Sequence, residues 1–204
     1  MTSFYTGDPV GRLNPQTVTG IGELNSVTGL TVSHKQLGSQ IQSTFTLTNV
    51  PQSVVNGTEY QSTLLFTFPK GKISNVGSEL TIAQKTTSVV ADTLNASSTG
   101  AISLGTAAAS NVALTSTMAN FVPSTAFVSS ATINVAGTAV TGYKDEVADD
   151  NIKVLDGSST AKTLYLNTAY ATTANVDADA TQTLTGTITV VWQFWGGTVS
   201  AFEN

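Results

Sequence analysis

The sequence predicts an all-β protein whose body is an antiparallel β-sandwich or jelly roll. Apolar and polar side chains alternate with a period of two in several segments, which is typical of strands with one buried face. The 35 threonines and 21 serines supply about 27% of the 204 residues, and these residues favour strands and turns respectively. Turn formers separate the alternating segments and helical patterns are few, as in antiparallel sandwiches.

Residues 1–38 are richer in closely spaced turn formers than the rest of the chain. They predict an extended N-terminal arm before a body at 39–204. Closely spaced turn formers leave no room for a strand longer than about five residues. The range also holds more apolar side chains than a solvated tail needs, among them Val18, Ile21, Leu24, Val27 and Leu30. We therefore expect an arm packed on the body or on a partner, and the alternative is a disordered tail.

The first body strands are expected at residues 41–48 and 63–68. In the second, Leu64, Phe66 and Phe68 share one face, and Pro69 ends it because proline has no N–H for the ladder. Between them, Asn56-Gly57 indicates a hairpin turn.

Further strands are expected in a second set of short segments. The segments 73–76 and 80–83 predict two short strands around Gly77. Strands are also expected at 101–104, 131–136 and 162–170.

At most one or two short helices are expected. Leu114, Met118 and Phe121 recur at helical spacing in residues 110–121, with Ser110 as a candidate cap. A weaker helical pattern covers residues 87–94. Threonine and serine dilute the helix propensity of both segments.

The last strand has the strongest pattern. From 183 to 194 the even positions are Leu, Gly, Ile, Val, Trp and Phe, and four consecutive odd positions are Thr. Twelve residues exceed the usual strand length of about five or six. A slip of one residue would expose Ile188 and Trp192, so the register is tightly set.

Composition argues against several classes of protein. With 8 Lys and Arg against 13 Asp and Glu, the net charge is −5, so the basic surface that nucleic acids require is lacking. No apolar stretch approaches the length of a membrane span, and the N-terminal residues do not look like a signal peptide, so we expect no membrane partner and synthesis in a cytoplasm. The chain has no cysteine, so disulfide scaffolds and thiol chemistry are excluded.

No catalytic or cofactor motif stands out, and we expect neither an enzyme nor a cofactor. A serine triad needs a histidine base, and the single histidine, His34, lies in no such motif. One histidine is also too few for the usual zinc site. His34 is interpreted as an exposed turn residue beside Lys35, and the alternative is a lone acid–base or interface group.

Acidic residues gather at 145–156 and again at Asp177-Ala178-Asp179. The first segment lacks the glycine and the terminal glutamate of an EF-hand loop, so a solvated acidic loop is expected and no metal ligand is assigned. Whether it binds calcium is left open. The second segment is expected to form the tip of a hairpin loop before the last strand.

The C-terminal aromatic residues point to a contact surface. Alternation places Trp192 and Phe194 inward and Trp195 outward, where Trp195 can anchor an interface, cover a sheet edge or stack on a sugar. The candidate interface residues share an apolar side chain and a position in the arm or near the C-terminus: Val18, Ile21, Leu24, Val27, Leu30, Trp195 and Phe202.

Together these features resemble virion structural proteins of tailed bacteriophages, in particular capsid decoration (cement) and head or tail accessory proteins. The segments that carry the resemblance are 58–71, 130–137 and 177–181, the last leading into the final strand. The resemblance implies a homo-oligomer, often a trimer, clamped to the exterior of a head shell. Its partners would be the major capsid protein or other virion proteins, and its role would be to stabilise the shell without catalysis.

Two other functions remain open at this point. A tail or head fibre of adhesin type could bind surface glycans, but it would need clustered aromatic residues and placed carboxylates, and most aromatic residues here occupy alternating core positions. A secreted or cell-surface adhesin would need an export signal or an anchor. Only 10% of the residues are charged, and the threonines lie on the outer faces of alternating strands, so the low charge is a surface property. Such a surface binds through neutral hydrogen bonds and apolar contacts.

Overall fold

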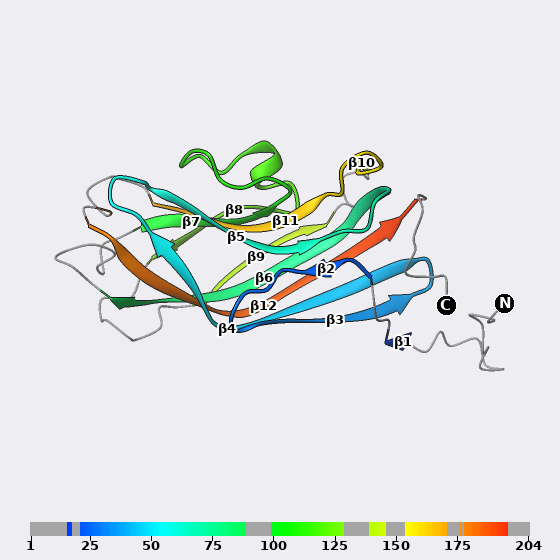
Figure 1. The fold of residues 1–204 in the computed structure, drawn as a ribbon, viewed down its shortest axis with the longest axis horizontal. Helices are drawn as coiled ribbons and strands as arrows, with labels where there is room; N and C mark the ends of the chain where they lie inside the picture. The colour runs from blue at the N-terminus through cyan, green and yellow to red at the C-terminus, as the bar shows by residue number, and fades with distance from the viewer. Residues whose placement is uncertain are drawn as a thin grey trace.

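The computed structural model describes residues 16–17, 21–88, 99–128, 139–145, 154–170, 176 and 178–195. Two antiparallel sheets pack face to face in this part of the chain, and its one helical segment is the 3-10 turn η1 (Ser116–Met118) (Figure 1). The predicted all-β sandwich is therefore confirmed.

The strands fall into two sheets. Sheet A has the order β1-β3-β4-β12-β6, with β10 and β9 both paired to the far edge of β6, and sheet B has the order β2-β5-β11-β7-β8. Sheet A consists of β1 (Gln16–Thr17), β3 (Leu30–Leu37), β4 (Gln40–Val54), β6 (Lys72–Ser88), β9 (Val140–Asp145), β10 (Val154–Asp156) and β12 (Ala180–Phe194). Sheet B consists of β2 (Glu23–Leu24), β5 (Tyr60–Thr67), β7 (Thr99–Gly105), β8 (Val122–Val128) and β11 (Thr163–Tyr170).

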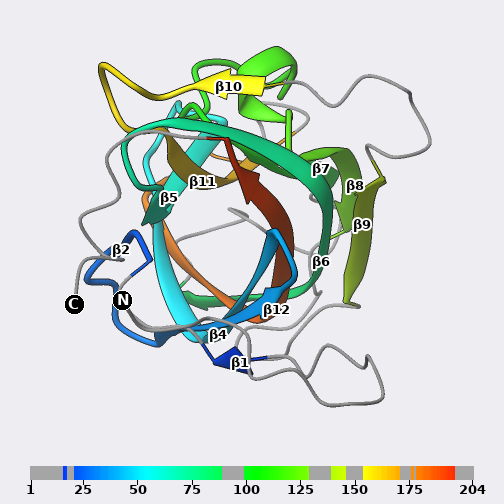
Figure 2. The same ribbon diagram turned by 90° about the vertical axis from the view of Figure 1, so that its right-hand side faces the viewer.

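The pairing order is that of a jelly roll. The long strands pair from the outside of the chain inward, as β4 with β12, β5 with β11, β6 with β9 and β7 with β8. This is a long two-stranded ribbon folded over so that its successive pairs alternate between two sheets. Figure 2, viewed along the long axis, shows the two sheets curving around a common interior.

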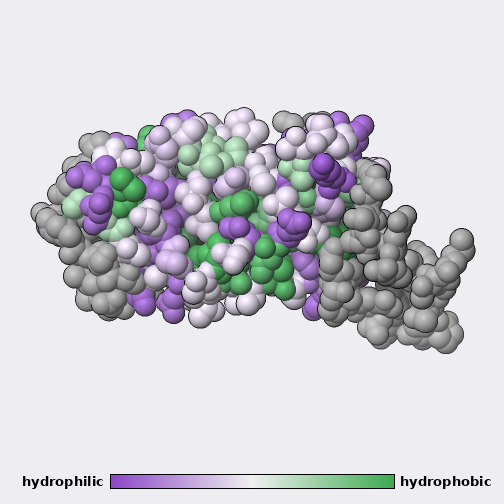
Figure 3. All heavy atoms as spheres, viewed as in Figure 1, coloured by the Kyte–Doolittle hydropathy of each residue, from purple (hydrophilic) through white to green (hydrophobic). Residues whose placement is uncertain are grey.

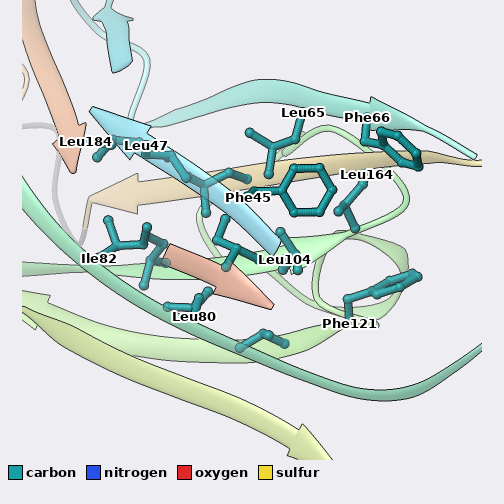
Figure 4. Close-up of a cluster of buried hydrophobic side chains, with 14 of the residues drawn as sticks. Phe45, Leu47, Leu65, Phe66, Leu80, Ile82, Leu104, Phe121, Leu164 and Leu184 are labelled. Carbon is teal, nitrogen blue, oxygen red and sulfur yellow. The ribbon is translucent and has the colours of Figure 1, made fainter. Parts of the chain in front are cut away.

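The core fills the space between the sheets with aliphatic and aromatic side chains (Figure 4). Phe68 is its centre, with ring centroids 5.3 Å from Phe66, 5.7 Å from Phe121 and 5.1 Å from Trp192. The contacts with Phe66 and Trp192 are edge-to-face and the contact with Phe121 is stacked, and such pairs add to the free energy gained by burying the rings. Residues from β5, β12 and the segment before β8 therefore join the sheets at one point.

The strand β12 confirms the strongest sequence pattern. It is central in sheet A, paired with β4 on one side and β6 on the other. Leu184, Ile188 and Trp192 are fully buried, while Thr185 and Thr187 are exposed.

Three predicted strand details need correction. The segments 73–76 and 80–83 belong to one strand, β6, of 17 residues. Gly77 does not interrupt it because it pairs with Val191 on one side and Asp145 on the other. In β5, a bulge turns both Leu65 and Phe66 into the core and leaves Leu64 half-buried.

The helix predicted at 110–121 is wrong. Only the three residues of η1 are helical there, and the backbone has positive φ at Leu114 (21°) and Ser116 (56°), outside the α-helical region. Leu114 and Met118 are buried as predicted for a helical face, but this burial comes from a loop. Residues 87–88 of the weaker helical segment, 87–94, form the end of β6. Residues 89–94 and the strand expected at 131–136 lie outside the described residues.

Part of the range expected for the arm belongs to the sheets. The strand β3 pairs with β4 from Leu30 to Leu37, and β2 pairs with β5. The body therefore starts before the expected boundary at residue 38, because the single turn between β3 and β4 allows a full antiparallel ladder. Residues 1–15 lie outside the described part of the chain.

The predicted turn at Asn56-Gly57 is present but does not form a hairpin. The Thr58 amide donates to the Val55 carbonyl at 2.9 Å, and Gly57 has φ +72°, as in a type II turn. The turn connects β4 in sheet A to β5 in sheet B. The loop before β12 likewise connects the two sheets, and its Asp179 accepts a hydrogen bond from the Asn56 amide at 2.8 Å.

Candidate interaction surface on sheet A

His34 is a buried core residue, so its interpretation as an exposed turn residue is wrong. It lies on the inner side of β3 and is 8% exposed, with its ring 5.6 Å from that of Phe66. Its Nδ1 is 2.8 Å from the Ser43 hydroxyl, which also accepts a hydrogen bond from the Trp192 indole at 2.9 Å. Burial lowers the pKa of His34, which favours the neutral ring. The contact cross-links β3, β4 and β12.

The acidic segment is described only at its ends. Asp156 accepts hydrogen bonds from the hydroxyl and the amide of Ser158, which lower the pKa of its carboxyl group. Residues 146–153 and Asp177 lie outside the described residues. No group of three or more acidic or histidine side chains that could hold a metal occurs in the part of the chain that the structure describes.

The predicted interface residues separate into three groups. Ile21 and Leu30 are buried in the protein's own core, at 2% and 6% exposure, and Val27 packs against it. These three are therefore not exposed for contact with a partner. Leu24 and Trp195 are exposed, at 39% and 53%. Val18 and Phe202 lie outside the described residues.

The outer face of sheet A carries rows of side chains that the strand register aligns. One row has threonine at each position on five adjacent strands: Thr31 on β3, Thr46 on β4, Thr187 on β12, Thr81 on β6 and Thr141 on β9. The next row is Ser33, Thr44, Thr189, Glu79 and Tyr143 on the same strands. We call these two rows the threonine face.

The threonine face is polar and nearly uncharged. Directly opposite side chains on neighbouring strands have Cβ atoms about 5 Å apart, close enough to contact one another. The hydroxyls of Thr81 and Thr141 lie 3.2 Å apart. Glu79 is the only charged side chain of the ten. Figure 3 draws the side of the molecule seen in Figure 1, where hydrophilic, intermediate and hydrophobic side chains are interspersed on the described surface.

A shallow hollow of about 400 Å³ interrupts the second row at β6, β9 and β12. Its lining residues are Gly77, Ser78, Glu79, Tyr143, Thr189 and Val191. Tyr143 is 71% exposed. Gly77 has no side chain, so the sheet surface is lower there than at its neighbours. The hollow thus combines an aromatic ring, a carboxylate and an apolar floor.

Trp195 lies at the end of the same face. Its indole N–H donates to the Ser74 hydroxyl at 2.7 Å, and its amide donates to the Lys72 carbonyl at 2.8 Å. The exposed Val154 is the β10 partner of Ser74. The strand β1 pairs with the same end of sheet A, because Gln16 is opposite Gln36 and the ladder continues to Ile41 and Trp192. The described chain therefore enters and leaves the sandwich at this end.

The outer face of sheet B is covered by the loop of residues 106–121 (Figure 1). Asn167 on β11 is fully buried beneath it, and its amide donates to the carbonyls of Ala107 at 3.0 Å and Met118 at 2.8 Å. Its side-chain oxygen accepts from the Ser62 hydroxyl at 2.7 Å and the Ala109 amide at 3.1 Å. One side chain therefore holds several points of the loop on the sheet.

A buried network of neutral polar side chains was also not predicted from the sequence. It consists of Gln52, Thr63, Gln84, Thr168, Tyr170 and Gln182, all buried and drawn from both sheets. Tyr170 donates to Gln182 at 2.5 Å and accepts from Gln84 at 3.2 Å. Burial raises the pKa of Tyr170, so the phenol stays a neutral donor. The sequence signal for this network was Gln182, a polar residue at an inward position of the alternating strand β12.

Comparisons with protein-family models, curated proteins and solved structures gave no match. Within the described residues, no helix has the length and apolar character needed to cross a membrane. The threonine face and the Trp195 end are therefore the candidate functional site on the evidence of this chain alone.

Proposed function

We propose that the chain is a structural protein of a phage virion that binds the exterior of the head shell and reinforces it. The shell would contact the threonine face and the Trp195 end of sheet A. The major capsid protein is the proposed partner, and the protein would act as a homo-oligomer, with a trimer favoured, and without a catalytic role.

The threonine face is the observation that carries this proposal. It is open, five strands wide and nearly free of charge, with four of the threonines in its first row exposed: Thr31, Thr46, Thr141 and Thr187. Threonine offers a hydroxyl and a methyl group at low conformational cost, so the face can form neutral hydrogen bonds and apolar contacts together. Contacts of this kind depend little on salt.

The architecture supports the proposal without deciding it. Jelly rolls occur in viral capsid proteins and also in lectins. Because one fold supports many functions, the assignment must depend on the surface. Trp195 supports it further, since this tryptophan is exposed and tryptophan is enriched among the residues that dominate binding energy at interfaces.

Charge placed on the threonine face tests the proposal. Thr187→Lys adds a lysine at the centre of the first row, and Thr117→Lys adds the same charge on the loop over sheet B as the matched control. Both positions are exposed. We expect Thr187→Lys to lower co-sedimentation with heads of the encoding phage at least tenfold and Thr117→Lys to bind normally. Normal occupancy by Thr187→Lys would rule out this face as the contact.

The arm prediction is tested separately. Deletion of residues 1–15 leaves every described strand in place. If the arm clamps a neighbouring subunit, the truncated protein should fold but occupy heads poorly. Native mass measured for the full and truncated chains would show whether the arm also holds the oligomer together.

Surface-glycan binding, as in a fibre or adhesin, is the second candidate. The observation that favours it is the exposed ring of Tyr143 beside Glu79, since sugars stack on aromatic faces and bond to carboxylates. A glycan array binding the purified protein, with loss on Tyr143→Ala, would support this function in place of the first.

A further inference from the structure

The hollow on the threonine face has the composition of a site for a cation. The register places Glu79 of β6 between Thr189 of β12 and Tyr143 of β9, so the three side chains are direct neighbours across three strands. Glu79 and Tyr143 are exposed, and Thr189 is half-buried. The carboxylate and the aromatic ring therefore project from the same small area.

The negative charge of Glu79 has no described partner of opposite sign. Among the described residues, no ion pair to its carboxylate is present. Lys144 follows Tyr143 in the sequence but lies on the other side of β9, where its ammonium donates to the Asn120 carbonyl at 3.3 Å. The whole chain carries a net charge of −5. Within the described residues, the exposed carboxylate of Glu79 is therefore available to a cationic group of a partner.

The other lining residues suit a long cationic side chain. An exposed aromatic ring attracts a cation to its face, with arginine observed more often than lysine. Gly77 leaves space beside the carboxylate, and Val191 offers an apolar contact for a methylene stem. Arginine fits better than lysine because its planar fork can pair with a carboxylate through two parallel hydrogen bonds while stacking on a ring.

We propose that the hollow receives an arginine side chain presented by the shell protein. This inference rests on the proposed function, since it names the chemistry by which the partner recognises the threonine face. The neutral rows supply contact area, and the Glu79–Tyr143 pair supplies register, because a single charged contact on an uncharged face allows one docking position.

A neutral sugar is the competing occupant. It would stack on Tyr143, but it would leave the charge of Glu79 unbalanced at the centre of a covered face, which is unfavourable. A sugar also bonds to an amide nearly as well as to a carboxylate. Replacement of Glu79 by glutamine therefore separates the two occupants.

Binding to heads of the encoding phage provides the main test. The variants are Glu79→Gln, Tyr143→Ala and Tyr143→Phe, with Glu23→Gln as the control because it removes one exposed carboxylate elsewhere and gives the same net charge. We expect Glu79→Gln and Tyr143→Ala each to weaken co-sedimentation about tenfold. Tyr143→Phe and Glu23→Gln should bind as the parent does. The effect of Glu79→Gln should shrink in 500 mM salt.

A second measurement uses defined probes and needs no heads. Acetyl-arginine amide titrated into the labelled protein should shift the amide resonances of Glu79 and Tyr143, and chitotriose should not. The shifts should disappear in Glu79→Gln. Shifts caused by chitotriose and retained in Glu79→Gln would assign the hollow to a glycan and overturn the proposal.

The outcomes distinguish the inference from the proposed function. If Thr187→Lys abolishes head binding while Glu79→Gln and Tyr143→Ala bind normally, the face docks on the shell without an arginine in the hollow, and only the inference fails. If all these variants bind heads as the parent does, the threonine face is not the contact, and the proposed function fails if the parent protein itself does not bind heads. Arginine-dependent shifts would then show that the hollow binds cations for another partner.

Discussion

The outer faces of the two sheets differ in what covers them. Sheet B is covered by residues 106–121, which bury Leu114 and Met118 on it and leave Asn167 with no exposed surface. Sheet A has no such cover over its threonine face in the described structure, and Thr46, Thr141 and Thr187 are exposed. Within the described residues, one face of the sandwich is therefore covered by its own chain and the threonine face is not.

The contrast shows two uses of polar side chains on strands. On sheet B, Asn167 and Ser103 form hydrogen bonds with backbone groups of the covering loop, so their polar groups are paired inside the molecule. On sheet A, the threonine hydroxyls face outward. A buried polar group must be paired to be tolerated, whereas an exposed hydroxyl exchanges water for a partner at little cost. Changes on sheet B should therefore affect stability, and changes on sheet A should affect binding.

The largest stability loss is expected for Asn167→Ala. Its amide and oxygen make four hydrogen bonds to Ser62, Ala107, Ala109 and Met118. Their removal leaves the Ala107 carbonyl without its side-chain donor and creates a cavity beneath the loop, so the free energy of unfolding should fall by about 3 kcal/mol. Urea unfolding would measure this. Asn111→Ala, on the exposed surface of the same loop, is the control and should cost less than about 1 kcal/mol. Equal losses would show that Asn167 does not hold the loop.

A pair of glycine substitutions compares the two faces directly. A Cβ at Gly105 would lie 2.3 Å from the backbone carbon of Met118, whereas a Cβ at Gly77 would meet only the Lys144 carbonyl at 3.6 Å. Gly105→Ala should cost about 2 kcal/mol by forcing the loop off sheet B. Gly77→Ala should be nearly neutral in unfolding experiments. A costly Gly77→Ala would mean that sheet A is covered more closely than the structure shows.

Local alternation predicted β4, β5, β11 and β12 because it depends on neighbours in the chain, whereas β3, β8 and β9 were not predicted. The alternation in β12 places Leu184, Ile188 and Trp192 inside whatever the topology is. The covering loop was not predictable in this way, since its anchor Asn167 lies 49 residues from Met118 in the sequence. Helical spacing of Leu114 and Met118 therefore predicted a helix where long-range hydrogen bonds select a loop.

The candidate site was predictable in its chemistry but not in its geometry. Threonines on outer faces were expected, but their alignment into one row depends on bulges. The register of β12 with β4 shifts next to Asn49, whose φ is +51°. The burial of His34 and the adjacency of Glu79 and Tyr143 likewise follow from strand pairing between residues that are separated in the sequence. Trp195 could be identified from the sequence because alternation alone places it on the outer face.

Acidification should lower the stability of the protein through His34, which lies on the inner side of sheet A. Its pKa is lowered in the folded protein by burial, so the unfolded chain binds the proton more readily. The stability that the neutral ring contributes is present above the ordinary pKa of about 6.5 and is lost as pH falls through the folded value. The urea midpoint should therefore drop between pH 7 and pH 5. His34→Gln, which cannot titrate, should show a smaller drop, and parallel profiles would exclude His34 as the cause.

The smallest stability effect is expected on the threonine face itself. Thr187→Val removes an outward hydroxyl that makes no hydrogen bond shown in the structure, and valine favours strands as threonine does, so the free energy of unfolding should change by less than about 0.5 kcal/mol. Thr185→Val is the matched control two residues away, because its hydroxyl accepts the Asn49 amide at 3.1 Å and supports the bulge. Its loss should cost about 1 kcal/mol. Head binding should show the opposite order, with Thr187→Val the weaker binder. A variant that loses stability at Thr187 and keeps full binding would reverse the assignment of this face from partner contact to internal support.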